Sequence, residues 1–412
     1  MSGQRRWHLF EVTGVELEYM VVDSESLSVL PVADEVLRAV AGDYVSDVIE
    51  GEIAWSNELV LHVIELKADE PAPRLEGLPA QFDASVAKIN RILGGLGGRL
   101  MPTAMHPWMD PARETRLWPH EYSPIYEAFD RIFGCSGHGW SNLQSLHLNL
   151  PFADDEEFGR LHAAVRLLLP LLPALAASSP VVEGRLTGSL DSRMEAYRGN
   201  AAKVPSVGGL VVPEAVFSQR EYDEKIFQPM FREIAPHDPE GVLRDEFLNS
   251  RGAIARFSRG SIEIRVIDVQ ECPRADLAVA AATVAALRLL VDEKWTPYSA
   301  QKRPPVEPLA RILRRAVVEA ERAEIEDPAY LSHFGLSETC TAGELWRHLV
   351  SESFESGNLA VDPWLDPLEV ILEEGTLARR IVTALGPNPT SRDLHRVYGR
   401  LANCLARGEM FG

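Results

Sequence analysis

Acidic or polar residues alternate with apolar residues in four separated segments of this chain. Residues 14–18 read GVELE, residues 63–67 read VIELK, residues 146–150 read LHLNL and residues 261–268 read SIEIRVID. Successive side chains of a β-strand point to opposite faces of the sheet, so each segment would carry one polar and one apolar face as a strand. The chain is therefore expected to fold around a sheet with a polar face.

Taken singly, each segment has a plain structural explanation. The glutamates fit a solvated sheet face, the histidine a hydrogen-bonded core residue, and the Glu-x-Arg pair an ion pair within one strand. Recurrence favours another interpretation, because carboxylates that converge on one sheet face repel each other unless cations lie between them. The ionisable residues concerned are Glu16, Glu18, Glu65, His147, Glu263 and Arg265.

The composition of this residue set indicates its chemistry. Oxygen ligands with a single imidazole favour Mg²⁺ or Mn²⁺ over a structural zinc ion, which would prefer several Cys or His ligands. Divalent ions together with arginine are suited to phosphoryl transfer, so nucleotide chemistry is the leading interpretation. A P-loop fold is not expected, because residues 94–98 read GGLGG, lack the lysine and follow a predicted helix.

Two arginines lie in a glycine- and serine-rich stretch. Residues 184–193 read GRLTGSLDSR and contain Arg185 and Arg193. Glycines let backbone amides approach an anion, and a guanidinium group matches the paired oxygens of a carboxylate or phosphate. A loop that is merely flexible explains the glycines equally well, and both interpretations stay open at this point.

Charge and cysteine content narrow the class of protein. The 412 residues carry a net charge of −20, which repels nucleic acids and anionic membranes. The four cysteines are widely spaced and predict reduced thiols. The first residues lack the apolar stretch of a signal peptide, and the hydrophobic stretch 161–182 is interrupted by Arg166, Pro170 and Pro173. We expect a soluble cytoplasmic protein.

Hydrophobic periodicity predicts alternating strands and helices, followed by a helical C-terminal part. Strands are predicted at residues 10–22, 52–67, 99–105, 143–150, 253–257 and 261–269. Helices are predicted at residues 34–41, 81–96, 122–133, 158–177, 192–197, 275–290, 310–322, 341–350, 367–377 and 392–405. We expect a catalytic domain over residues 1–300, with a helical region over residues 301–412 packed on it.

The ordered set of motifs resembles the glutamate-cysteine ligase type 2 family, also called the carboxylate-amine ligases, over roughly residues 10–290. The resemblance rests on segments 14–18, 63–65, 146–150 and 262–265, and on Ser178-Ser179-Pro180 with Gly184 and Arg193. This family belongs to the glutamine synthetase superfamily. The resemblance implies an α+β fold with a curved, mostly antiparallel sheet that forms a funnel with helices outside, plus the helical C-terminal region.

The resemblance also implies ligands and residue roles. The funnel would hold ATP, two or three Mg²⁺ ions and an amino acid, and Mn²⁺ is the alternative metal. Arg265 and Glu263 would be catalytic, with Arg265 stabilising the phosphoryl group. Arg193, Arg185 and Asn149 are assigned to substrate binding. The implied metal ligands are Glu16, Glu18, Glu65, His147 and Glu263.

The implied reaction is ATP-dependent amide formation in glutathione biosynthesis. The side-chain carboxylate of glutamate would attack the terminal phosphorus of ATP and form an acyl phosphate, and the amine of cysteine would then displace phosphate. Two alternatives stay open. The enzyme could use a different amine, or the chain could be a catalytically silent ligand-binding homologue. The expected partners are these small molecules and, as a homo-oligomer, further copies of the chain.

Two positions depart from the family pattern. Asn149 stands where family members often have a second histidine, and Pro151 falls near a position where glycine is usual. The number of metal ions and the nucleotide geometry therefore stay open. The helical tail is longer than in compact members, and it would cover the funnel, form an oligomer contact, or do neither.

Overall fold

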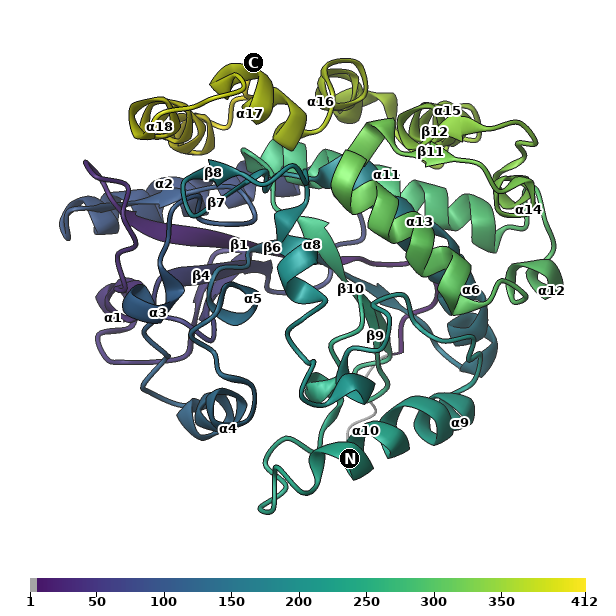
Figure 1. The fold of residues 1–412 in the computed structure, drawn as a ribbon, viewed down its shortest axis with the longest axis horizontal. Coiled ribbons are helices and arrows are strands. Elements are labelled where there is room, and N and C mark those ends of the chain that lie inside the picture. Colours follow the sequence, from purple (N-terminus) through teal and green to yellow (C-terminus); the bar gives the residue numbers. More distant parts are fainter. Residues whose placement is uncertain (1–5) are drawn as a thin grey trace.

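One antiparallel sheet organises the computed structural model, which describes residues 6–412 (Figure 1). The strand order is β2-β3-β4-β1-β6-β10-β9, and β5 also pairs with β1. Every one of these pairs is antiparallel, which confirms the predicted fold class. The strands are β1 (Gly14–Asp23), β2 (Asp47–Glu50), β3 (Ile53–Asn57), β4 (Val63–Ala68), β5 (Gly98–Met101), β6 (Ser145–Pro151), β9 (Ala253–Arg256) and β10 (Ser261–Asp268).

The apolar face of the sheet packs against helices. Val15, Leu17 and Tyr19 of β1 are buried in the main core. Helices α2 (Leu78–Gly94) and α11 (Pro273–Val291) join that core from their own buried sides. Glu16 and Glu18 lie on the opposite face of β1, whose further residues Met20 and Val22 are buried against the C-terminal helices.

Among the C-terminal helices, α15 and α16 lie outside α11, whereas α17 and α18 also pack on β1 and β5 through Met20, Val22 and Met101. Helices α15 and α16 contact α11, and α18 contacts α2 and β5. Figure 1 shows α2 and α11 between these helices and the sheet. The C-terminal helices are α13 (Val306–Glu319), α14 (Pro328–Leu331), α15 (Ala342–Glu355), α16 (Val361–Glu374), α17 (Leu377–Leu385) and α18 (Ser391–Arg407).

Shorter elements complete the chain. The remaining helices are α1 (Ala33–Ala41), α3 (Pro111–Glu114), α4 (Ser123–Phe133), α5 (His138–Ser141), α6 (Asp155–Leu168), α7 (Pro173–Ala176), α8 (Ser192–Tyr197), α9 (Gln219–Tyr222), α10 (Gln228–Ile234) and α12 (Tyr298–Gln301). Two small hairpins are formed by β7 (Val181–Val182) with β8 (Arg185–Leu186), and by β11 (Glu324–Ile325) with β12 (Cys340–Thr341).

Three predicted elements are divided in the structure. The extended region predicted at 52–67 is two strands, β3 and β4, separated by a turn at residues 58–62. The helix predicted at 158–177 breaks into α6, a 3₁₀ turn and α7, because Pro170 and Pro173 cannot donate backbone hydrogen bonds. The helix predicted at 367–377 spans the end of α16 and the start of α17.

The structure agrees with the sequence on membrane spans. Within residues 6–412, no helix combines the length and the apolar character that crossing a bilayer requires.

Candidate active site

The polar face of the sheet forms the floor of a cavity of about 460 Å³. Side chains of β1, β4, β6 and β10 line it, together with residues of α4, α5 and the segment around α8. None of the described residues beyond Arg265 lines it, so the C-terminal helices do not cover this cavity. The predicted residues that line it are Glu16, Glu18, Glu65, His147, Arg193, Glu263 and Arg265.

Strand register brings the acidic residues together. Glu16 lies opposite Lys67 on β4 and opposite His147 on β6. Glu18 lies directly opposite Glu65. Directly paired residues of antiparallel strands share a face, and like charges in such pairs are destabilising. The sheet therefore concentrates negative charge on this part of the cavity floor.

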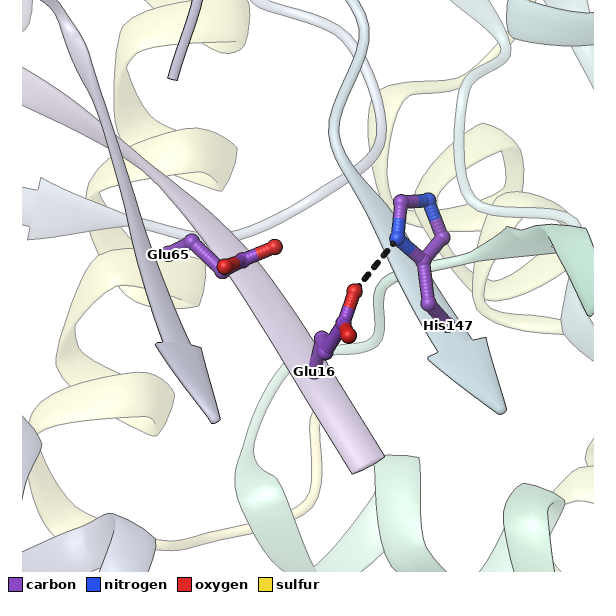
Figure 2. Close-up of side chains that lie close together, drawn as sticks. All are labelled: Glu16, Glu65 and His147. Carbon is purple, nitrogen blue, oxygen red and sulfur yellow. Dashed lines mark hydrogen bonds and ion pairs between the residues drawn. The ribbon is translucent and has the colours of Figure 1, made fainter. Parts of the chain in front are cut away.

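His147 is held between two glutamates. Its Nδ1 lies 3.0 Å from Glu16 Oε2 (Figure 2), and its Nε2 lies 3.8 Å from Glu18 Oε1. Burial acts to lower the pKa of His147, but the neighbouring Glu18 and Glu16 outweigh it and raise the pKa to about 9. Burial likewise acts to raise the pKa of Glu16, but the hydrogen bond and charge of His147 lower it to about 2. These two groups thus form a charged pair.

Two further carboxyl groups, those of Glu65 and Glu58, have raised pKa values. Burial, with the nearby charge of Glu16, raises the pKa of Glu65 to about 7. Burial and the charges of Glu18 and Glu65 hold the pKa of Glu58 well above its usual range. Glu58 enters the cavity from the turn between β3 and β4, so the sequence placed it near Glu65 but gave no sign that it faces the same space.

These side chains fit divalent cations with oxygen ligands. Ligand atoms of Glu16, Glu65 and His147 lie within 4.8 Å of one another, and so do those of Glu18, Glu58 and Glu65. Four carboxylates with one imidazole suit Mg²⁺ or Mn²⁺, and the raised pKa values of Glu58 and Glu65 reflect burial and repulsion that a bound cation would relieve. We call this set the acidic side of the cavity: Glu16, Glu18, Glu58, Glu65 and His147.

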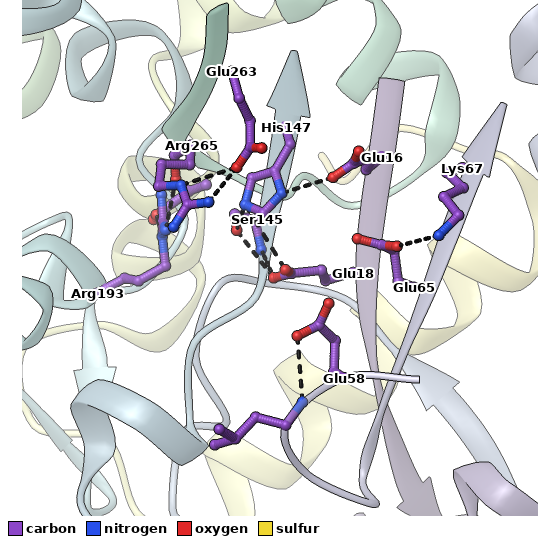
Figure 3. A network of polar contacts seen from close by, with 12 residues as sticks. Glu16, Glu18, Glu58, Glu65, Lys67, Ser145, His147, Arg193, Glu263 and Arg265 are labelled. Carbon is purple, nitrogen blue, oxygen red and sulfur yellow. Dashed lines mark hydrogen bonds and ion pairs between the residues drawn. The ribbon is translucent and has the colours of Figure 1, made fainter. Parts of the chain in front are cut away.

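Glu263 belongs to neither ligand group, because arginines engage both of its oxygens. Arg265 Nε donates to Glu263 Oε1 at 3.0 Å (Figure 3), and Arg256 Nη1 donates to Glu263 Oε2 at 3.3 Å. Burial acts to raise the pKa of Glu263, but the charge of Arg265 prevails and lowers it. The ion pair within β10 that the sequence offered as the plain explanation is therefore present inside the cavity.

Arg193 is anchored by a second buried carboxylate. Its Nε donates to Asp268 Oδ1 at 2.5 Å, and both side chains are about 1% exposed. Ser178 N and Ser179 Oγ each donate to Asp268 Oδ2 at 2.9 Å, which explains the paired serines of the sequence motif. The Nη2 of Arg193 is buried without a hydrogen-bond partner among residues 6–412. One donor of this guanidinium thus remains available.

A β-bulge places Asp268 on the cavity side. Glu263 pairs with Asn149 and Asp268 pairs with Ser145, but the register shifts between Ile264 and Ile267. Strict alternation along β10 would put Asp268 on the face opposite to Glu263, and the extra residue of the bulge reverses this. We call the following set the arginine side of the cavity: Arg193, Arg256, Arg265, Glu263 and Asp268.

Two predicted substrate-binding residues are not among those that line the cavity. Asn149 Nδ2 donates to Glu16 Oε1 at 3.0 Å, but Asn149 is not among the residues that line the cavity. Arg185 is exposed on β8, outside the described cavity lining. The structure therefore does not bring Arg185 to the residues of the polar sheet face.

Aromatic side chains form another part of the lining. Phe129 lies 5.2 Å from Trp140 and 6.3 Å from Phe247 between ring centroids. Tyr126 and Tyr197 also line the cavity. These residues come from helices and loops, where no alternating pattern marks a shared face, so the sequence analysis missed them.

A family model matches most of the chain. The model described as glutamate-cysteine ligase family 2 covers residues 12–399. A protein of Archaeoglobus fulgidus named only as uncharacterized is 30% identical over 401 residues, which are 97% of this chain and 99% of that protein. A protein of Rubrobacter xylanophilus with the name "Putative glutamate--cysteine ligase 2-3" is 28% identical over 65% of this chain and 66% of its own length.

Solved structures share the fold. A glutamate–cysteine ligase from Francisella tularensis in complex with AMP aligns with a TM-score of 0.66 and 11% identity, over 98% of this chain and 90% of that one. A bifunctional glutathione synthetase from Pasteurella multocida aligns with a TM-score of 0.58 and 16% identity, over 97% of this chain and 52% of that one.

Proposed function

This chain belongs to glutamate-cysteine ligase family 2, and from that membership we propose that it joins glutamate to cysteine through an acyl phosphate. Membership of this family by itself indicates an ATP-dependent carboxylate-amine ligase, without naming its substrates. One observation supports the proposed reaction through an acyl phosphate: a single cavity combines a carboxylate-rich side with an arginine-rich side. Such a cavity has complementary places for cations and for anionic substrates.

Divalent metal ions belong to the acidic side in this proposal. The residues that would hold Mg²⁺ or Mn²⁺ there are Glu16, Glu18, Glu58, Glu65 and His147. Bound metal would supply positive charge between the phosphates of ATP and the carboxylate of glutamate, two anions that otherwise repel each other. His147 would be a ligand only in its neutral form, so the proton between His147 Nδ1 and Glu16 Oε2 would have to leave.

The arginine side would hold the phosphoryl group. A glutamate oxygen attacks the terminal phosphorus, the bond to the bridging oxygen breaks, and ADP leaves. The amine nitrogen then attacks the acyl carbon, phosphate leaves with the bonding electrons, and the nitrogen gives up one proton. Arg265 lies on the cavity wall beside Glu263, and Arg193 offers its free Nη2. Guanidinium groups placed in this way stabilise phosphate charge during transfer.

The residues that line the cavity also indicate which part of the chain is catalytic. We infer that residues 1–300 are the catalytic part, because the described cavity lining ends at Arg265. Residues 301–412 would support that part through the contacts of α15 and α16 with α11.

Release of ADP tests the proposed reaction. The protein is incubated with Mg²⁺, ATP and glutamate, with and without each of a panel of amines. Release that requires both glutamate and cysteine supports the proposal, whereas a requirement for another amine changes the acceptor. Nucleotide binding without turnover for any pair would establish the silent homologue. The retained carboxylate cluster argues against that alternative, since buried like charges without a function are costly.

A variant at the arginine side tests the assigned machinery. Glu263→Gln is expected to abolish turnover while circular dichroism shows that the fold is kept. Melting should occur at a lower temperature than in the wild type, because Arg265 and Arg256 lose the buried carboxylate that neutralises them. Glu338→Gln, at an exposed position, is the matched control and should keep full activity. Near-normal turnover of Glu263→Gln would remove Glu263 from the site.

A further inference from the structure

Lys67 extends into the acidic side from β4. Its Nζ donates to Glu65 Oε1 at 3.2 Å and to Ser56 Oγ at 3.0 Å. Ser56 Oγ donates to the same oxygen of Glu65 at 2.7 Å. Ser56 and Glu65 lie directly opposite each other on β3 and β4, so two paired strands fix the cluster. The ammonium group is thus held in place, although the side chain is 36% exposed.

Lys67 is the main fixed positive charge at this end of the cavity. Within residues 6–412, it is the one lysine or arginine that forms an ion pair with a member of the acidic side. Three of the arginines that line the cavity pair with other carboxylates: Arg265 and Arg256 with Glu263, and Arg193 with Asp268. Arg259 also lines the cavity and its charge helps to lower the pKa of Glu16, but among residues 6–412 it forms no ion pair with the acidic side. Lys67 also lies opposite Glu16 in the register of β1 and β4.

The two oxygens of Glu65 face different neighbours. Oε1 receives Lys67 and Ser56, while the other oxygen is directed to the side where Glu16 and Glu18 lie (Figure 3). Glu65 is also the member common to both groups of candidate metal ligands. A carboxylate shared by two cations usually gives one oxygen to each, and here an ammonium group already occupies one of the two oxygens.

We propose that Lys67 is a built-in monovalent cation that takes the place of one divalent ion at Glu65, and so limits how many divalent ions the acidic side holds. The inference rests on the metal site of the proposed function. Lys67 is a positioning residue in this view, because it acts through Glu65 and not on the substrates. A neutral side chain at position 67 would leave the Ser56 hydroxyl as the remaining donor to Glu65 Oε1 and remove a positive charge close to the site.

Titration with Mn²⁺ tests the proposal without any turnover. Binding of Mn²⁺ to the whole chain is followed by electron paramagnetic resonance, with no nucleotide and no glutamate present. Lys67→Met is expected to bind one more Mn²⁺ per chain than the wild type, or to bind its weakest Mn²⁺ about tenfold more tightly. Removal of a unit charge at close range in a partly buried site has an effect of this order.

Matched variants separate position from charge. Lys67→Arg keeps the charge and should keep the wild-type Mn²⁺ count. Lys88→Met removes a lysine that pairs with Glu50 on the outside and should also leave the count unchanged. If Lys67→Met does not fold by circular dichroism, Lys67→Gln replaces it, because the amide can still donate to Ser56 and Glu65.

Two results would overturn the proposal. The first is a Lys67→Met chain that binds no more Mn²⁺ than the wild type and binds it no more tightly. The second is a wild-type chain that binds no Mn²⁺. Failure of the ligase reaction would be a separate result: a chain that gains Mn²⁺ in Lys67→Met but releases no ADP with any amine keeps this inference and loses the proposed function.

Discussion

The two sides of the cavity balance their charges in opposite ways. On the arginine side, Glu263 meets two guanidinium groups and Asp268 meets one. On the acidic side, four carboxyl groups share the imidazole of His147 and the ammonium of Lys67. The arginine side is therefore complete as the chain folds, whereas the acidic side needs added cations. This difference predicts that, in the metal-free chain, the ion pairs of the arginine side add to stability and the carboxyl cluster of the acidic side reduces it.

The largest effect is expected for Glu65→Gln. Turnover should fall about 1000-fold, because a member of both ligand groups is lost and metal charge stabilisation amounts to several kcal/mol. The metal-free variant should nevertheless melt at a higher temperature than the wild type, because one buried repulsive carboxyl group has gone. The measurements are ADP release and thermal unfolding in EDTA. A variant that loses activity and stability together would contradict the division between the two sides.

Arg193→Met should destabilise the metal-free protein, whereas Glu65→Gln should stabilise it. The free energy of unfolding should fall by about 3 kcal/mol, because Asp268 is left as a buried carboxylate without its ion-pair partner. Urea unfolding of the metal-free protein measures this change. Pairing Arg193→Met with Asp268→Asn should recover part of the loss, since the stranded charge is then removed. A loss below about 1 kcal/mol would show that the arginine side is not the stabilising half.

The pH dependence of the metal-free chain gives the smallest effect. The folded pKa of Glu65 is raised from 4.5 to about 7, so the folded state holds a proton that the unfolded state releases in this window. Stability should therefore fall as the pH rises from about 4.5 to about 7, by on the order of 2 kcal/mol from this group. Melting in EDTA across this range should show a smaller decline for Glu65→Gln than for the wild type. Glu58 should continue to contribute in the variant, since its pKa is also raised.

The same pH series of melting measurements, repeated with Mg²⁺, tests whether a cation binds these carboxyl groups. Cation binding favours the ionised carboxyl groups, so the decline in stability between pH 4.5 and 7 should shrink or reverse in the wild type. An identical decline with and without Mg²⁺ would argue against a metal site on the acidic side.

Strand alternation predicted much of the acidic side correctly. Glu16, Glu18, Glu65 and His147 share a sheet face in the structure, because residues two apart on a strand point the same way and the strands pair in register. Glu58 could not be assigned in this way, since it enters from a turn inside a segment predicted as one strand. The side-chain period of a strand carries no information about a turn that folds back over the sheet.

The arginine side was less accessible to prediction from the sequence. The pairing of Arg193 with Asp268 joins residues 75 positions apart in the chain, and the pairing of Glu263 with Arg256 crosses the short hairpin of β9 and β10. The position of Asp268 depends on a bulge, which alternation cannot reveal. Arg185 illustrates the reverse case, because a glycine-rich stretch suggested an anion site where the structure has an exposed hairpin residue.

The bulge in β10 makes the length of this strand matter as well as its side chains. Deleting one residue between Ile264 and Ile267 would restore simple alternation, rotate Asp268 toward the apolar core and leave Arg193 with no anchor. Homologous chains that share this cavity should therefore keep the number of residues between Glu263 and Asp268 unchanged.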